Sequence, residues 1–285
     1  TAFKYFKCIS DQNEVDGYYG LGLLFSADYF EGKYIDKAIY YYELASNNNH
    51  ESAQFDLAVI YYLGKYIKKD VKKAIYYFSL AAKQGCKNAQ FNLGIIYYEG
   101  NYVTRDIDKA VYYYSLAAKK DHSVALFDLG IIYFENKYVK RDMNKSINYL
   151  LKSANLENSE AQYNLGIIYL NGFYIPKNIQ KGIYYLSLSA DQYFPEAQLN
   201  LGVAYLEGVI IERNIEKGIR YLTLSAKQNN STAQFNLGFI YSDNKATDFF
   251  IQSASNNNIK ACSVVGYLYQ EGKFIKKDNE KSVHF

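Results

Sequence analysis

The sequence contains few of the side chains from which catalytic and metal-binding sites are commonly built. Its 285 residues include three histidines and three cysteines. His50 and His122 occupy the same place in two different loops and His284 stands near the end, which predicts solvated histidines rather than a metal cluster or a base–nucleophile pair. No glycine-rich phosphate-binding loop is present, because the glycines are spaced for helix packing and helix ends. We therefore expect no catalytic residue, no metal and no cofactor, and we do not interpret the chain as an enzyme.

Strong charge, cysteine pairs and long apolar runs are also missing. The net charge is +3, too small to require a nucleic acid or an acidic membrane as partner. Cys8, Cys86 and Cys262 form no C-x-x-C pair and cannot all pair with one another, which favours a reducing compartment. No apolar run approaches the roughly 18 residues of a membrane span. We expect a cytoplasmic protein, but both ends read as cut within a repeat, so a signal peptide could lie outside this sequence.

Tyrosine is abundant, with 33 residues, and an internal repeat accounts for it. The segments Ala89–Gly100 and Asp106–Ala118 form a unit that recurs every 36 residues, with one step of 28. A period between about 20 and 50 residues indicates a repeat architecture. Counting Ala89 as position 1, that position holds Gly17, Ala53, Ala89, Ala125, Ala161, Ala197, Ala233 and Ala261. We predict a single array over residues 1–285, in which residues 1–16 are the second half of a truncated repeat and the repeat from Ala261 is also truncated.

Each repeat predicts two amphipathic helices. In the first helix, position 1 is small, position 5 is mostly leucine and position 9 is aromatic, a spacing that makes one apolar stripe. Position 6 is glycine in every repeat but one, where it is Ala58. A glycine within a helix costs about 1 kcal/mol relative to alanine, so we expect another helix to pass close to this position. The second helix has small residues at positions 22 and 29 and an aromatic residue at position 25, a face that should pack on its neighbours.

Residues typical of helix caps mark the ends of these helices. Position 12 is glycine or Asn136, which tolerate the left-handed conformation of a helix C-terminus. Position 18 is Asp or Asn, as expected at an N-cap. Two repeats are irregular. In the first, Glu31 and Gly32 come four residues late, which predicts one extra helical turn, whereas the repeat from Ala233 lacks eight residues, which we assign to the loop, so that both helices remain.

The pattern resembles the Sel1-like repeat, a relative of the tetratricopeptide repeat. The residues that match the family motif are Ala89, Leu93, Gly94, Tyr97, Gly100, Asp106, Lys109, Ala110, Tyr113, Tyr114, Ala117 and Ala118. The resemblance implies an all-α fold, a right-handed α/α superhelical solenoid of about eight two-helix repeats, with the first helices lining its concave face. Such proteins act as adaptors and regulators that hold other proteins, and they share no defining active site. Some relatives carry a disulfide in each repeat, which this chain does not, so we do not extend their activities to it.

If the first helices line a groove, positions 3, 7 and 10 face it and form an apolar, aromatic band. Such anchors give affinity in peptide and helix recognition, so we take this band as the candidate partner-binding site. Its residues are Phe55, Val59, Tyr62, Phe91, Ile95, Tyr98, Phe127, Ile131, Phe134, Tyr163, Ile167, Leu170, Phe235 and Phe239, and the band continues through Leu199, Val203 and Leu206. Glu99, Glu135 and Glu207 at position 11 would form an acidic rim. The alternative is that these apolar side chains pack between adjacent first helices.

A second candidate surface is a row of cations along the loop edge. Position 17 holds Lys69, Arg105, Arg141, Lys177, Arg213 and Lys277, and a lysine recurs at position 21. Such a row could bind an acidic protein, a membrane or a nucleic acid. The alternative is that the lysine stems cover apolar surface while their tips stay solvated. An apolar groove does not suit base-by-base reading, so we expect no nucleic-acid partner.

Three functions remain open on these observations. The leading hypothesis is a scaffold that binds a peptide or helix of another protein in the groove. The second is a structural subunit of a larger assembly, which would use its outer and edge surfaces. The third is a regulatory array attached to an enzyme domain outside this chain. The sequence does not indicate the oligomeric state.

Overall fold

The computed structural model describes residues 2–10, 14–26, 32–241, 244–272 and 274–284, and over these residues the protein is all-α, as predicted. Seventeen helices are described: α1 Ala2–Ser10, α2 Val15–Ser26, α3 Ile35–Asn47, α4 Glu51–Leu63, α5 Val71–Gln84, α6 Lys87–Glu99, α7 Ile107–Ala118, α8 Ser123–Glu135, α9 Met143–Asn155, α10 Ser159–Asn171, α11 Ile179–Asp191, α12 Pro195–Glu207, α13 Ile215–Lys227, α14 Ser231–Ile240, α15 Asn244–Ser255, α16 Ile259–Glu271 and α17 Asn279–His284. Among these helices, none has both the length and the apolar character needed to cross a membrane.

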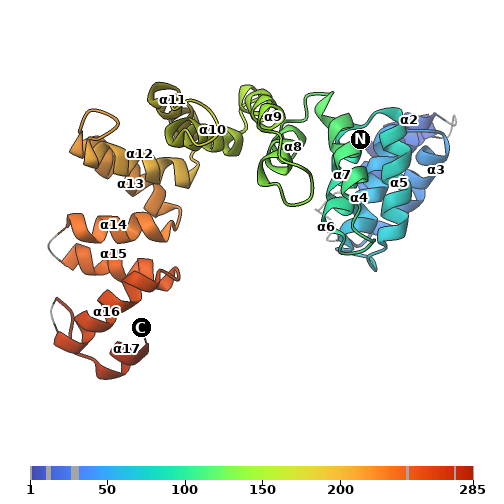
Figure 1. Cartoon of the computed structure of the whole chain (residues 1–285). Coiled ribbons are helices and arrows are strands. Elements are labelled where there is room, and N and C mark those ends of the chain that lie inside the picture. The colour runs from blue at the N-terminus through green and yellow to red at the C-terminus, as the bar shows by residue number, and fades with distance from the viewer. Residues whose placement is uncertain (1, 11–13, 27–31, 242–243, 273, 285) are drawn as a thin grey trace. The chain divides into compact units, whose positions relative to one another are not determined.

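The chain divides into two compact units, Thr1–Asp142 with helices α1 to α8 and Met143–Phe285 with helices α9 to α17. Within each unit, the two helices of a repeat pack side by side, as α4 does with α5 and α12 with α13 (Figure 1). The second helix also packs on the first helix of the next repeat, as α5 does on α6 and α11 on α12. Within a unit, a helix therefore buries its apolar surface on the helices before and after it, which is how a repeat array builds its core.

The helix ends use the predicted caps. At position 18, Oδ1 of Asp70 accepts the backbone N–H of Lys73 at 3.0 Å, and Oδ1 of Asn178 accepts that of Lys181 at 2.9 Å. At position 12, Asn136 ends α8 with a left-handed φ of 56°, and the glycines at this position are left-handed too. Short polar side chains and glycine thus fix where each helix begins and ends.

A second left-handed residue, at position 33, follows the second helix, and the sequence pattern did not predict it. The residues concerned are Asn49, Gly85, Asp121, Glu157, Tyr193, Asn229 and Asn257. The next N–H then turns back to the helix, as when Cys86 N–H donates to the carbonyl of Ala81 at 3.0 Å, which satisfies a carbonyl that the helix end leaves unpaired. Tyr193, with a φ of 63°, is the bulkiest of these residues.

The glycine at position 6 lies where the two helices of a repeat touch. A Cβ atom on Gly94 would lie 2.5 Å from Cδ1 of Tyr114, and one on Gly202 would lie 2.8 Å from Cγ of Leu222. The predicted close approach is therefore confirmed. Tyr114 and Leu222 stand at position 26 and are buried, whereas Tyr113 at position 25 is half-buried. Position 25 packs beside the core, in agreement with the predicted packing face, whereas the buried residue opposite the glycine is position 26, which the sequence pattern did not single out.

The aromatic residue at position 25 instead stacks on the ring at position 9. The rings of Tyr97 and Tyr113 have centroids 5.8 Å apart and planes inclined by 4°, and Nζ of Lys109 lies 5.2 Å from the centroid of Tyr97. Equivalent ring stacks are Tyr61–Tyr77, Tyr169–Tyr185 and Tyr205–Tyr221. The lysine of position 21 thus covers aromatic surface and keeps an exposed side chain. This packing explains much of the tyrosine content.

A buried glutamine at position 2 joins consecutive repeats. Nε2 of Gln198 donates to the carbonyl of Ala190 at 3.1 Å on the preceding helix, and its Oε1 accepts from Nε2 of Gln228 at 2.9 Å on the following one. Gln54 and Gln162 are bridged in the same way. Because a buried amide is costly unless both of its ends are hydrogen-bonded, this bridge sets the register between repeats.

The irregular repeats keep their helices. In the repeat from Ala233, α14 and α15 are both present, as predicted, and α14 has 10 residues where α12 has 13. The turn at residues 242–243 lies outside the described residues. The extra helical turn predicted before Gly32 falls on residues 27–31, which also lie outside them, so that prediction stays untested.

Candidate partner-binding surface

We call the surface formed by positions 3, 7 and 10 of the first helices the first-helix face. The candidate residues predicted from the sequence lie there on α4, α6, α8, α10 and α14. All of them are half-buried except Phe239, of which 66% is exposed. The structure therefore gives these side chains both a packing role and an accessible edge.

Some aromatic rings of this face pack on the second helices. The centroid of Phe55 lies 5.8 Å from that of Phe78, and the centroid of Phe91 lies 5.8 Å from that of Tyr114. Phe91 also stacks on His122, with centroids 4.4 Å apart. Phe78 and Tyr114 belong to the buried core, so these contacts agree with the packing interpretation. Removing the ring of Phe55 or Phe91 would change stability as well as any binding.

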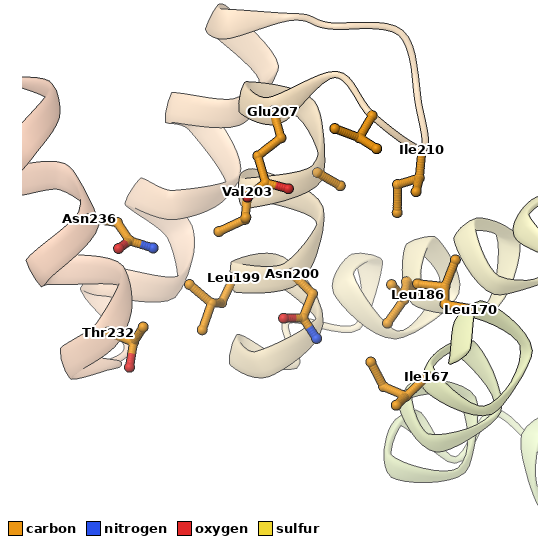
Figure 2. A pocket seen from close by; sticks show the side chains of 12 residues that line it. Ile167, Leu170, Leu186, Leu199, Asn200, Val203, Glu207, Ile210, Thr232 and Asn236 are labelled. Carbon is orange, nitrogen blue, oxygen red and sulfur yellow. The ribbon is translucent and has the colours of Figure 1, made fainter. Parts of the chain in front are cut away.

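A hollow opens on this face in the second unit, between α10, α12 and α14 (Figure 2). Its volume is about 420 Å³. Ile167 and Leu170 of α10 line one side of it, and Leu199 and Val203 of α12 line another. Four residues of the predicted band, Ile167, Leu170, Leu199 and Val203, are thus brought together at an open apolar site.

Two side chains that line the hollow are smaller than their counterparts in other repeats. Position 3 is aromatic in the other repeats from Gly17 to Ala233, but here it is Leu199. Position 8 is isoleucine or leucine in every other repeat, but here it is Ala204. Both residues line the hollow. Smaller side chains at these two positions leave more room than an aromatic ring and an isoleucine would.

A half-buried polar residue at position 4 accompanies the apolar band, and the sequence-based prediction missed it. The residues are Asp56, Asn92, Asp128, Asn164, Asn200 and Asn236. In the first unit the hydroxyl of Tyr19 donates to Oδ2 of Asp56 at 3.1 Å. Burial raises the pKa of the Asp56 carboxyl, and burial together with this carboxylate raises the pKa of Tyr19 to about 12. Asp or Asn recurs at position 4 with the same period as the aromatic band, and this recurrence is the sequence signal that could have identified the polar residue.

The cations of the loop edge are exposed but have structural contacts. The guanidinium of Arg105 donates to the backbone oxygen of Glu99 at 3.0 Å and to the hydroxyl of Tyr138 at 2.9 Å. Nε of Arg213 donates to the backbone oxygen of Leu206 at 3.1 Å. These carbonyls end the first helices, where a cation is favourable. The use of this edge by an anionic partner stays a prediction.

Two loop histidines act as helix caps and are half-buried, so the prediction that they are solvated is wrong. Nδ1 of His50 accepts the backbone N–H of Ala53 at 3.1 Å, and Nδ1 of His122 accepts that of Ala125 at 3.2 Å. An imidazole nitrogen supplies the acceptor that a helix N-terminus needs. Burial, with a smaller effect of Lys87, lowers the pKa of His122. Within the described ranges, no group of three or more His, Cys, Asp or Glu side chains is arranged to hold a metal.

Paired helices that pack through small buried residues define the chain as an α/α repeat protein. The sequence of the repeat identifies its family. The chain belongs to the Sel1 repeat family, whose repeat matches residues 15–50, 51–86, 87–122, 123–158, 159–194, 195–230 and 259–285. Proteins of this family form solenoids that generally serve as protein-interaction scaffolds and are typically non-catalytic. The shortened repeat between residues 231 and 258 is not among the matched segments.

Two solved structures resemble the whole chain. A Sel1 repeat protein from Oxalobacter formigenes is 25% identical with a TM-score of 0.78, and the match covers 99% of this chain and 84% of that one. The protective antigen c5321 of uropathogenic Escherichia coli strains is 27% identical with a TM-score of 0.55, and the match covers 99% of this chain and 70% of that one. No curated protein matches the sequence significantly.

Proposed function

We propose that this chain is a non-enzymatic scaffold that holds a peptide or helix of a partner protein on its first-helix face. The observation that carries the proposal is the hollow between α10, α12 and α14, where the apolar band is open to solvent. Apolar side chains exposed around a hollow are favourable contacts for a partner, because binding removes them from water. The partner-holding role that is general in the Sel1 repeat family supports the same proposal.

Site-specific photo-crosslinking in cells tests this function directly. A photoreactive amino acid replaces Glu207, which lines the hollow and is exposed. A matched variant replaces Glu216, which is exposed on the second helix α13. We expect a discrete protein adduct from position 207 and none from position 216. Equal labelling at both positions, or none at 207, would contradict the proposal.

The second candidate function, a structural subunit of a larger assembly, is favoured by a different surface. Tyr40, Tyr76, Tyr112 and Tyr184 recur at position 24 of the second helices, and each exposes between 57% and 59% of its surface. Aromatic residues are enriched at protein interfaces. A photoreactive amino acid at Tyr184 therefore completes the crosslinking experiment, because adducts at 184 without adducts at 207 support the assembly function.

We also propose that the protein works in a reducing compartment such as the cytoplasm. All three cysteines are unpaired. Free thiols persist where glutathione and thioredoxin keep them reduced. Fractionation of cells that express the protein tests the compartment.

A further inference from the structure

We propose that the hollow between α10, α12 and α14 binds an extended segment of a partner protein in which an aliphatic side chain stands beside a lysine or arginine. The inference rests on the proposed function and adds the chemistry of the occupant. Three features of the hollow carry it: the apolar walls, two asparagine amides turned toward the space, and one unpaired carboxylate at its edge (Figure 2).

The walls select an aliphatic side chain. Ile167, Leu170, Leu199 and Val203 surround a space of about 420 Å³, and Leu186, which is buried, lies behind it. This volume exceeds that of a single leucine or isoleucine side chain, so the adjoining main chain also fits. The walls carry no ring, whereas position 3 in the neighbouring repeats does. A branched aliphatic group therefore contacts aliphatic side chains of α10 and α12 and no aromatic ring.

The asparagines at position 4 favour an extended main chain over a helix. Asn92 donates to the backbone oxygen of Asn88 in its own helix at 2.8 Å. Nδ2 of Asn200, by contrast, donates a long hydrogen bond of 3.5 Å to the hydroxyl of Tyr163 and makes none within its own helix, and the amide of Asn236 has no hydrogen-bond partner within the described residues. Asn200 and Asn236 come from adjacent first helices and both line the hollow (Figure 2).

An asparagine amide offers one donor group and one acceptor, which match the N–H and C=O of a peptide unit. An extended chain leaves these backbone groups unpaired, whereas a helix pairs them internally. Two such amides on neighbouring helices therefore add affinity for an extended segment and none for a helix.

The charge at the edge selects a basic neighbour for the aliphatic residue. Glu207 is the charged side chain among those lining the hollow, it is exposed, and no cation of the described residues pairs with it. In the first unit the equivalent Glu99 accepts a hydrogen bond from Nδ2 of Asn101 at 3.1 Å. A lysine or arginine of the partner would complement the carboxylate of Glu207, and an acidic residue there would be repelled.

Selection from a display library of random dodecapeptides against the intact chain tests the inference. We expect the selected peptides to share leucine, isoleucine, valine or methionine beside lysine or arginine. Their affinity is then measured by fluorescence anisotropy for the parent and for Leu199→Phe/Ala204→Ile, which fills the hollow with the residue types of other repeats. We expect this variant to lose at least about tenfold in affinity while its melting temperature stays equal or rises.

Two further variants test the charge and the amides. Glu207→Lys should weaken the selected peptide and favour its version with lysine changed to glutamate, while Glu216→Lys should change neither. Asn200→Ala/Asn236→Ala should weaken binding, whereas Asn92→Ala should not. Failure to select any peptide, equal affinity for the filled variant, or a helical circular-dichroism signal from the bound peptide would overturn the inference. Crosslinking at position 207 that survives filling of the hollow would leave the proposed function standing and this inference refuted.

Discussion

At the residue scale, different side chains at one position of the repeat form the same helix-capping hydrogen bond. His50, His122, Asn158 and Asn230 all precede a first helix, and each accepts the N–H of the residue three places on. As a helix cap, histidine differs from asparagine because its side chain can be protonated. In His122 burial lowers the pKa from its usual value of 6.5. The cap is therefore weakened by acid in this repeat and not where asparagine stands.

We predict that His122→Asn makes the stability of the protein less sensitive to mild acid. The folded state binds a proton on His122 less readily than the unfolded chain does, so stability is lost as the pH falls from about 7 through the ordinary histidine pKa toward the lower folded value. Asparagine keeps the cap without a charge. Urea unfolding at about pH 7.5 and about pH 5 measures the effect. If both proteins lose the same stability between these conditions, His122 is not the group responsible.

At the scale of the element, the ends of the second helices impose a left-handed backbone conformation that some of the residues there adopt only with strain. Position 33 is left-handed in each repeat for which it is described. Glycine and asparagine tolerate this conformation, but a side chain such as that of Tyr193 meets the following carbonyl. Tyr193 is 69% exposed, so little packing offsets the strain.

We predict that Tyr193→Gly stabilises the protein by about 1 kcal/mol, because relief of the left-handed strain exceeds the small loss of contacts. The midpoint of urea unfolding measures the change. Gly85→Ala is the matched control, since Gly85 holds the same position with a φ of 103°, and it should lower stability. A loss of stability in Tyr193→Gly would show that the tyrosine contributes contacts that outweigh its strain.

At the scale of the whole molecule, the packing is a chain of contacts between neighbours. Helix contacts join each repeat to the one before and the one after within a unit. In such an array, stability is close to a sum of repeat and interface contributions, so damage spreads only to adjacent repeats. The glycine at position 6 is the place where one substitution separates the helices of a single repeat.

We predict that Gly94→Leu increases amide hydrogen exchange in α5 to α8 much more than in α12 to α16. The new side chain would overlap Tyr114, and overpacking of this kind typically costs about 1–3 kcal/mol. Hydrogen exchange followed by mass spectrometry locates the change. Gly94→Ala is the control, because Ala58 occupies this position in the preceding repeat, and it should have a smaller effect. Equal loss of protection in all helices would contradict the nearest-neighbour description.

The sequence by itself determined the period, the helix pairs, the caps at positions 12 and 18 and the close approach at position 6. These features depend on residues within one helix or on a contact repeated in every unit, so each copy repeats the same signal. Only the tertiary structure decided that position 26 fills the core, that the glutamine at position 2 bridges three helices, and that the hollow opens beside Leu199 and Ala204. These depend on which side chains meet across neighbouring helices, and a hollow is defined by the volume that two small residues leave unfilled, which no single repeat reveals.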